Sequence, residues 1–118
     1  MKRTAIILLL SALVLAGADL TGHWPGMLET SRGADEHNLT LQQNGNSVTG
    51  TVAFSGKKWE IRNAKLEGRR LSFEITTSGA TPWVLFYDLQ VSGEEMAGSL
   101  TAKQGPFPGG KVRFRREK

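Results

Sequence analysis

Few residues of this chain have the chemistry that catalysis requires. Nucleophilic catalysis needs a cysteine or serine beside a base, with a third group that orients the base. The sequence has no cysteine, and its only histidines are His23 and His37. It also has no Gly-x-Ser-x-Gly segment and no glycine-rich phosphate loop. The chain is therefore expected not to be an enzyme.

Acidic residues cluster at two places. Asp35-Glu36-His37 combines three residue types that can bind a metal ion weakly. Adjacent residues in a loop rarely converge on one ion, which favours a solvated acidic turn instead. Glu94-Glu95 is likewise interpreted as a turn and not as a catalytic pair. We expect no metal site and no cofactor.

The aromatic side chains are more informative. Five of them fall on the inward phase of the strand patterns: Trp24, Trp59, Phe73, Trp83 and Tyr87. One interpretation is a solid core, in which these rings fill the tapered ends of a barrel. The other is an aromatic-lined cavity for a small apolar or planar ligand, since such sites are mostly apolar with few polar groups. Tyr87 and Gln43 would then supply the polar contacts.

A second candidate surface lies on the longest expected strand, residues 82–91. If Tyr87 faces inward, Val84 and Phe86 face outward. Two outward apolar residues on one strand can mark a contact with a partner protein or with a second copy of the chain. A one-residue slip would bury them instead, but the turn at Gly93 fixes the phase of the strand.

All these residues lie in segments that repeat one pattern. Apolar and polar residues alternate on either side of turn glycines at positions 45, 56, 68, 79 and 93. Such alternation puts one set of side chains on each face of a strand. Glycine supplies the positive φ of tight hairpin turns, and Asn44-Gly45 is the strongest turn signal, predicted as type I′.

The pattern predicts an all-β domain of eight antiparallel strands in an up-and-down meander. The expected strands cover residues 20–28, 37–43, 47–54, 58–66, 70–77, 82–91, 95–103 and 111–116. A polar loop is expected over residues 30–36, and a slip in the alternation at Arg62-Asn63 predicts a β-bulge. Closure into a small barrel removes both sheet edges, and a two-sheet β-sandwich is the alternative.

The first eighteen residues are expected to form a cleaved signal peptide. A basic pair at residues 2–3 precedes an apolar run over residues 5–15, and Ala16-Gly17-Ala18 provides the small residues of a cleavage site. Cleavage after Ala18 leaves residues 19–118 as a single domain, secreted or periplasmic, without a membrane span.

The processed chain is short and weakly basic. Without the basic pair at residues 2–3, 13 basic residues remain against 11 acidic ones, so the net charge falls from +4 to +2. This small excess disfavours a nucleic-acid partner. With no cysteine, the domain has no disulfide and must be stabilised by its hydrophobic core.

Gly22-His23-Trp24 on the first strand, followed by an eight-strand meander, resembles the calycin group, which contains the lipocalins and avidins. It also resembles short, lipocalin-like secreted bacterial proteins. In lipocalins, a Gly-x-Trp closes the barrel floor and a basic residue of the last strand covers the tryptophan ring. The resemblance implies this role for Gly22 and Trp24, with Arg113, Arg115 or Arg116 as the cation.

The chain departs from that group in having no further lipocalin motif, no closing helix and no disulfide. The residues of the avidin biotin site have no counterparts here. The resemblance therefore implies a fold and no particular ligand.

Two functions are compatible with these features. The first is a non-enzymatic protein that binds a small apolar or planar ligand inside the barrel. The second is a solid barrel in the cell envelope whose outer face, at Val84 and Phe86, contacts a partner protein.

Overall fold

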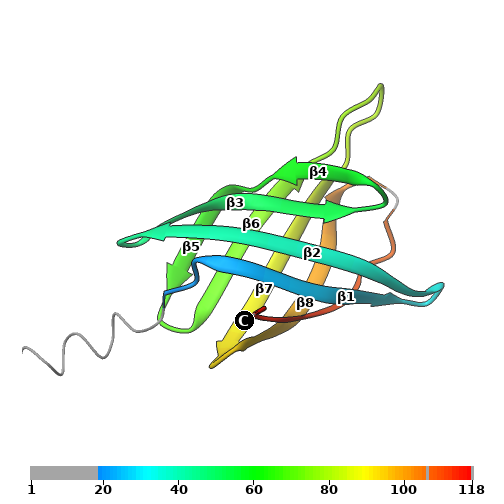
Figure 1. Cartoon of the computed structure of the whole chain (residues 1–118). Helices are drawn as coiled ribbons and strands as arrows, with labels where there is room; N and C mark the ends of the chain where they lie inside the picture. Colours follow the sequence, from blue (N-terminus) through cyan, green and yellow to red (C-terminus); the bar gives the residue numbers. More distant parts are fainter. Residues whose placement is uncertain (1–18, 106, 118) are drawn as a thin grey trace, which may run out of the picture.

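The chain folds as an antiparallel meander of β-strands. The computed structural model describes residues 19–105 and 107–117, so the predicted signal peptide lies outside the described residues. The strands are β1 (Gly22–Thr30), β2 (Gly33–Asn44), β3 (Ser47–Phe54), β4 (Lys57–Glu60), β5 (Arg62–Glu67), β6 (Arg70–Thr76), β7 (Val84–Ser92), β8 (Glu95–Gln104) and β9 (Gly110–Arg115). In Figure 1, β1, β2 and β3 run across the more steeply inclined β6, β7 and β8.

All nine strands belong to one sheet, in the order β4-β3-β2-β1-β9-β8-β7-β6-β5. β1 pairs antiparallel with β9, with Gly26 opposite Phe114. The predicted pairing of the first and last strands is therefore confirmed. The two edge strands, β4 and β5, follow each other directly in the chain. The sheet is thus a nearly closed barrel and not a two-sheet sandwich.

The strand count is nine instead of eight because the strand expected over residues 58–66 is divided. Between its two halves, the N–H of Ile61 donates a hydrogen bond to the carbonyl oxygen of Gly50 on β3, at 3.0 Å. Asn63 has φ +54°, and the pairing of β5 with β6 shifts register between Arg62 and Lys65. The predicted β-bulge is confirmed. The chain passes from its pairing with β3 to its pairing with β6 at Ile61, directly before this bulge.

Burial along the strands follows the alternation of apolar and polar residues in the sequence. On β7, Leu85, Tyr87, Leu89 and Val91 are buried, whereas the residues between them are partly or fully exposed. Buried apolar side chains come from β1, β2, β3, β6, β7, β8 and β9 and form one core cluster. Burying such a side chain contributes about 1.5–3 kcal/mol, so this core is the main source of stability.

The connection between β1 and β2 is tighter than predicted. Pairing continues to Thr30 opposite Gly33, so only Ser31 and Arg32 form the turn and the expected polar loop is wrong. Asp35-Glu36-His37 consequently lies within β2 and not in a loop. Because side chains alternate along a strand, residues 35 and 37 share the inward phase with Leu39.

The hairpin turns differ from the prediction in one detail. The β2–β3 turn is formed by residues 45–46, and Gly45 has φ +62°. Positive φ at both central positions, which type I′ requires, is instead found at Ser55 (φ +54°) and Gly56 (φ +77°). The glycine signal locates the turn correctly, but the turn begins one residue later than Asn44.

Trp24 closes one end of the barrel. Its ring is fully buried, and its Nε1 donates a hydrogen bond to the carbonyl oxygen of Leu20 at 3.0 Å. The Arg116 guanidinium lies 4.5 Å from the centre of the indole ring. Arg116 also donates hydrogen bonds to the carbonyl oxygens of Asp19 and Thr21, both at 2.8 Å. This floor ties the two ends of the described chain together.

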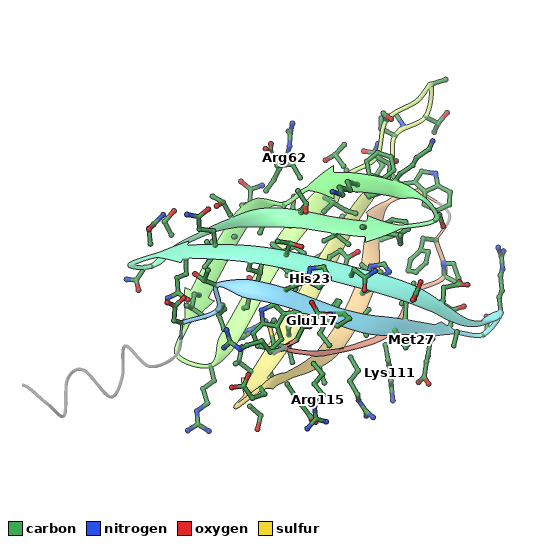
Figure 2. The ribbon with its side chains drawn as sticks, in the orientation of Figure 1. His23, Met27, Arg62, Lys111, Arg115 and Glu117 are labelled. Atoms are coloured by element: carbon green, nitrogen blue, oxygen red, sulfur yellow. The ribbon has the colours of Figure 1, made fainter. Side chains whose placement is uncertain are left out.

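Arg116, and not Arg113 or Arg115, covers Trp24. Val112 and Phe114 occupy the inward positions of β9, so Arg113 and Arg115 project outward. Figure 2 shows Arg115 pointing away from the barrel. Arg116 follows the last residue of β9 and is free of that alternation. A nearly closed antiparallel barrel with such a floor is compatible with a calycin-like fold.

Candidate functional site

The barrel end opposite Trp24 is a mouth formed by the connections β1–β2, β3–β4, β6–β7 and β8–β9. It contains a cavity of about 390 Å³. The cavity is lined by Leu28, Thr30, Arg32, Asp35, Trp83, Phe107 and Pro108. The lining combines aromatic and aliphatic side chains with one basic and one acidic residue. We refer to this cavity as the mouth cavity.

Trp83 is held in place by the base of the β6–β7 loop. The backbone N–H of Trp83 donates a hydrogen bond to Thr77 Oγ1 at 2.9 Å. In return, the backbone N–H of Thr77 donates to the Trp83 carbonyl oxygen at 2.9 Å. The backbone of Gly105 approaches the indole so closely that a Cβ there would lie 2.7 Å from the ring. Phe107 lies beside it, with ring centres 6.5 Å apart. The aromatic wall is therefore positioned by backbone contacts.

His37 lies below the mouth, one inward position beyond Asp35 on β2. It is fully buried, and its Nε2 lies 2.7 Å from the Tyr87 hydroxyl oxygen. Burial lowers the pKa of His37 to about 4, against a smaller opposing effect of the Asp35 carboxylate. Burial also raises the pKa of the Tyr87 phenol. Both groups are neutral at pH 7.

Phe54, the last residue of β3, covers His37. The two rings are stacked with centres 4.6 Å apart and an interplanar angle of 9°. The Phe54 ring also lies beside Trp59, with ring centres 6.2 Å apart and tilted by 41°. His37 Nδ1 and Trp59 Nε1 are both buried and have no hydrogen-bond partner among the described residues. Two polar atoms near the mouth are therefore unsatisfied.

The five predicted ligand residues do not surround one cavity. Trp24 lies in the floor, and Phe73 is stacked on Tyr87 in the middle of the barrel, with ring centres 4.6 Å apart. Of the five, only Trp83 lines the mouth cavity. Trp59 is partly buried nearby, against Phe54. The rings in the floor and the middle pack against one another and against the core, so the mouth cavity is the candidate ligand site within the barrel.

The two residues predicted to supply polar contacts to a ligand, Tyr87 and Gln43, do not lie together. Gln43 lies near the floor, where its Oε1 accepts a hydrogen bond from the Leu20 N–H at 2.8 Å. The Tyr87 hydroxyl lies in the middle of the barrel and pairs with His37. The signal for this was present in the sequence, since His37 is in phase with the inward Leu39.

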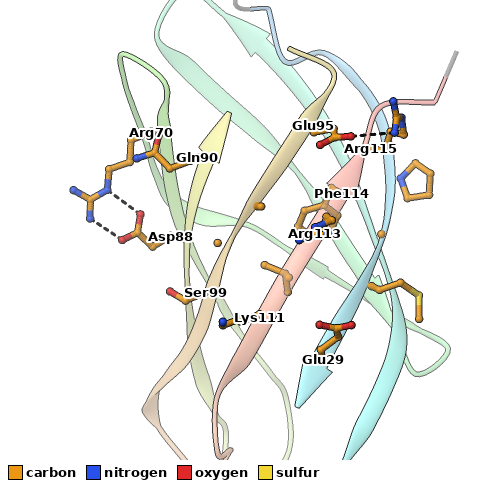
Figure 3. Close-up of a pocket in the computed structure, with 16 residues that line it drawn as sticks. Glu29, Arg70, Asp88, Gln90, Glu95, Ser99, Lys111, Arg113, Phe114 and Arg115 are labelled. Carbon is orange, nitrogen blue, oxygen red and sulfur yellow. Dashed lines mark hydrogen bonds and ion pairs between the residues drawn. The ribbon is translucent and has the colours of Figure 1, made fainter. Parts of the chain in front are cut away.

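A larger cleft of about 860 Å³ crosses the outer face of β1, β9, β8 and β7 (Figure 3). Its floor includes the small outward residues Ala97 and Ser99 of β8. On one side stand Lys111, Arg113 and Arg115, and on the other stand Arg70, Asp88 and Gln90. The cleft exists because short side chains on the middle strand lie between long ones on its neighbours. We call it the outer cleft.

Ion pairs occupy two places on the rim of the outer cleft. Arg70 and Asp88 form a double hydrogen bond at 2.8 Å, which lowers the pKa of the Asp88 carboxyl. Arg115 pairs with Glu95 at 3.0 Å. Met27, which is 43% exposed, also lines the cleft and is the large apolar side chain with the greatest exposure in the described part.

Val84 and Phe86 face outward, as the phase of β7 predicts, but neither lines the outer cleft. Both are only partly exposed. Lys103 lies over the Phe86 ring, 5.9 Å from its centre, and pairs with Glu74 at 2.6 Å. This ion pair lowers the pKa of the Glu74 carboxyl. Phe86 is therefore partly covered by a charged side chain of the same protein.

Neither protein-family models, nor curated proteins, nor solved structures give a match to this chain. Within residues 19–105 and 107–117, no group of three or more histidine, cysteine or acidic side chains is arranged to hold a metal ion. The same part of the chain contains no helix long and apolar enough to cross a membrane. The assignment of a function therefore rests on the geometry of the mouth and of the outer face.

Proposed function

We propose that this protein is an exported, non-enzymatic binding protein that holds one small apolar or planar ligand at the mouth of its barrel. The observation that carries the proposal is the mouth cavity, with Leu28, Trp83 and Phe107 in its wall. Its volume of about 390 Å³ lies within the range of roughly 300–1,000 Å³ that is usual for small-molecule sites. Few polar groups on an apolar wall are also typical of such sites.

The outer cleft is larger but less suited to a small molecule. Its walls are long charged side chains on a solvent-exposed sheet face, and these retain much conformational freedom. At the mouth, by contrast, backbone contacts hold Trp83 in place. A preorganised aromatic wall loses less entropy when a ligand binds, which favours the mouth.

The mouth site can be tested by screening planar aromatic compounds for a rise in melting temperature. A ligand that binds only the folded state stabilises it by RT ln(1 + [L]/Kd). We expect at least one compound with micromolar affinity, whose binding is weakened at least tenfold by Trp83→Leu and left unchanged by Phe86→Leu on the outer face. Binding that is insensitive to Trp83→Leu would place the ligand elsewhere and refute the proposal.

Export is part of this proposal and rests on the leader-like first eighteen residues. When the full sequence is expressed in a host with a secretory pathway, mass spectrometry of the exported protein should give Asp19 as the amino terminus. Exported material that retains Met1 would contradict it.

The outer cleft supports a second candidate function, which is contact with an acidic polypeptide. Lys111 and Arg113 line the cleft, and neither has an ion-pair partner among the described residues. An acidic peptide should bind by fluorescence anisotropy, more weakly at high salt, and its neutral amide analogue should not. Ser99→Trp, which fills the cleft floor, should abolish binding. Loss with Phe86→Ser instead would assign the contact to the surface predicted on β7.

A further inference from the structure

We propose that the ligand of the mouth is a zwitterion, in which a flat apolar ring carries one anionic and one cationic group. The ring lies against Trp83 and Phe107. The anionic group contacts Arg32, and the cationic group contacts Asp35. The inference rests on the proposed function, since it assumes that the mouth binds a small molecule. It assigns the chemical class of that molecule and two further recognition residues.

The first observation is that a basic and an acidic side chain line the same cavity as the aromatic residues. Arg32 and Asp35 are both lining residues of the mouth cavity, together with Trp83 and Phe107. The two charges come from one hairpin, because Arg32 belongs to the turn between β1 and β2 and Asp35 lies near the start of β2. A ligand in the cavity therefore meets both charges.

The second observation is that the hairpin holds these residues at defined positions. The backbone N–H of Arg32 donates a hydrogen bond to Thr30 Oγ1 at 3.1 Å, within a turn of two residues. Asp35 lies opposite Leu28 and shares the inward phase of β2 with His37. Its carboxylate is near enough to oppose the lowering of the pKa of His37. The acidic group is thus on the cavity side of β2.

The third observation is that Arg32 and Asp35 do not neutralise each other. Neither residue belongs to any of the ion pairs formed within the described part of the chain. By contrast, Arg70 and Asp88, on the neighbouring strands β6 and β7, form a double hydrogen bond at 2.8 Å. An unpaired cation and an unpaired anion therefore remain together at the mouth.

These two charges select the ligand class. A purely anionic ligand is attracted by Arg32 but repelled by the Asp35 carboxylate, and a purely cationic ligand meets the opposite situation. A zwitterion pairs with both side chains, and the planar guanidinium of Arg32 suits a carboxylate in particular. The remaining wall is apolar and aromatic, which suits a flat ring. Aromatic amino acids and related ring compounds combine these three features.

Four indole compounds with one ring system separate the contributions of the two charges. Ethylindole has neither charge, tryptamine adds the ammonium, indolepropionate adds the carboxylate, and free L-tryptophan has both. Isothermal titration calorimetry with the processed, exported protein at low salt measures all four affinities. L-tryptophan should bind about three- to fivefold more tightly than either singly charged compound, as one partly exposed ion pair predicts.

The outcomes distinguish this inference from the proposed function. If ethylindole or a singly charged compound binds as tightly as L-tryptophan, the zwitterion inference is wrong and the mouth site stands. If none of the four compounds binds, the inference is also wrong. The separate screen of planar compounds then decides whether the mouth binds any ligand.

Two variants that each remove one charge assign the contacts. Arg32→Gln should abolish the preference for L-tryptophan over tryptamine and keep its preference over indolepropionate, and Asp35→Asn should do the reverse. The matched controls are Glu36→Gln, which faces outward beside Asp35, and Arg69→Gln, in the exposed turn between β5 and β6 at the opposite end of the barrel. Preferences that survive in folded Arg32→Gln and Asp35→Asn proteins would exclude these residues.

Salt gives an independent readout on the unaltered protein. Raising the sodium chloride concentration from about 0.02 M to about 0.5 M shortens the screening length severalfold. The preference for L-tryptophan over ethylindole should shrink accordingly, while ethylindole affinity changes little. A preference of the same size at high salt would show that ion pairing is not its source and would overturn the inference.

Discussion

His37 and Tyr87 are fifty positions apart in the chain, and the hydrogen bond between them joins β2 to β7 inside an apolar barrel. In the described part of the chain, His37 is the ionisable side chain that is fully buried beside the apolar core. Its neutrality matters, because a charged imidazole at this depth would require strong compensation. A neutral ring, in contrast, can accept a hydrogen bond from the Tyr87 hydroxyl at Nε2.

The depressed pKa of His37 predicts that acid destabilises the fold. The pKa is about 4 when folded and near the ordinary value of 6.5 when unfolded. The unfolded chain therefore binds the proton first, and stability that is fully present above pH 6.5 is lost as the pH falls toward 4. Between pH 7 and pH 5 the free energy of unfolding should fall by about 2 kcal/mol.

Urea unfolding at each pH measures this effect. His37→Gln should lower stability but flatten its pH dependence between pH 5 and 7. His23→Gln, which changes an exposed histidine on β1, should keep the slope of the parent protein. An unchanged slope in His37→Gln would assign the pH dependence to another group.

Trp24 and Arg116 predict a graded loss of stability at the floor. Trp24→Ala removes a fully buried ring and should cost about 3–5 kcal/mol. Arg116→Ala removes the cation over that ring and should cost about 0.5–2 kcal/mol. Thermal unfolding followed by circular dichroism measures both. Arg113→Ala is the control, since Arg113 projects outward, and a cost equal to that of Arg116→Ala would contradict the assignment.

At the scale of strands, glycine positions the backbone in two different ways. In the hairpins, Gly45 and Gly56 supply positive φ. Within strands, Gly50 and Gly98 occupy inward positions where the neighbouring strand approaches closely. A Cβ on Gly98 would lie 1.9 Å from the Asp88 carbonyl oxygen. The missing side chain therefore allows close approach of β7 and β8.

Gly98→Ala should consequently destabilise the protein by roughly 2–3 kcal/mol, because the two backbones must separate to admit the methyl group. Ser99→Ala, one position along the same strand, faces outward and should change stability by less than about 0.5 kcal/mol. Urea unfolding measures both variants. Equal stabilities for the two would show that β8 tolerates a side chain at the inward position.

At the scale of the whole molecule, closure depends on one bent segment. β4 pairs with β3 and β5 pairs with β6, and Ile61 joins them with its side chain in the core. The remaining closure is the pairing of β1 with β9, which brings the first and last strands together. The barrel therefore has no large free edge for a further chain to extend.

Deletion of residues 110–118 should abolish cooperative unfolding of the entire domain. Without β9, both β1 and β8 lose a neighbour, and Val112 and Phe114 leave the core. A chain shortened only after Arg116 keeps β9 and should still unfold cooperatively. Its free energy of unfolding should fall by about 1 kcal/mol, because it lacks the hydrogen bond from the Glu117 N–H to the His23 carbonyl oxygen. Near-ultraviolet circular dichroism during heating distinguishes the two. A cooperative transition in the chain that lacks residues 110–118 would show that the sheet does not unfold as one unit.

The sequence by itself determined the local features of this protein. Alternation with period two determined which residues of β7 face inward, because that phase is a property of each strand. The turn glycines determined where strands end, and the slip in alternation at Arg62-Asn63 determined the bulge near the start of β5. The position of Trp24 at the closed end was predicted from the resemblance of Gly22-His23-Trp24 to the lipocalin segment, and its buried ring lies there.

Only the tertiary structure decided which of these residues meet. The contacts of His37 with Tyr87, and of Arg116 with Trp24, join positions far apart in the chain and depend on the order of strands around the barrel. Alternation assigns a side chain to the interior but not to the floor, the middle or the mouth. That depth follows from the register between strands, which is why five inward aromatic residues did not form one cavity. The outer cleft is completed in the same way, since the pairing of β1 with β9 brings Met27 and Glu29 beside the charged side chains of β9.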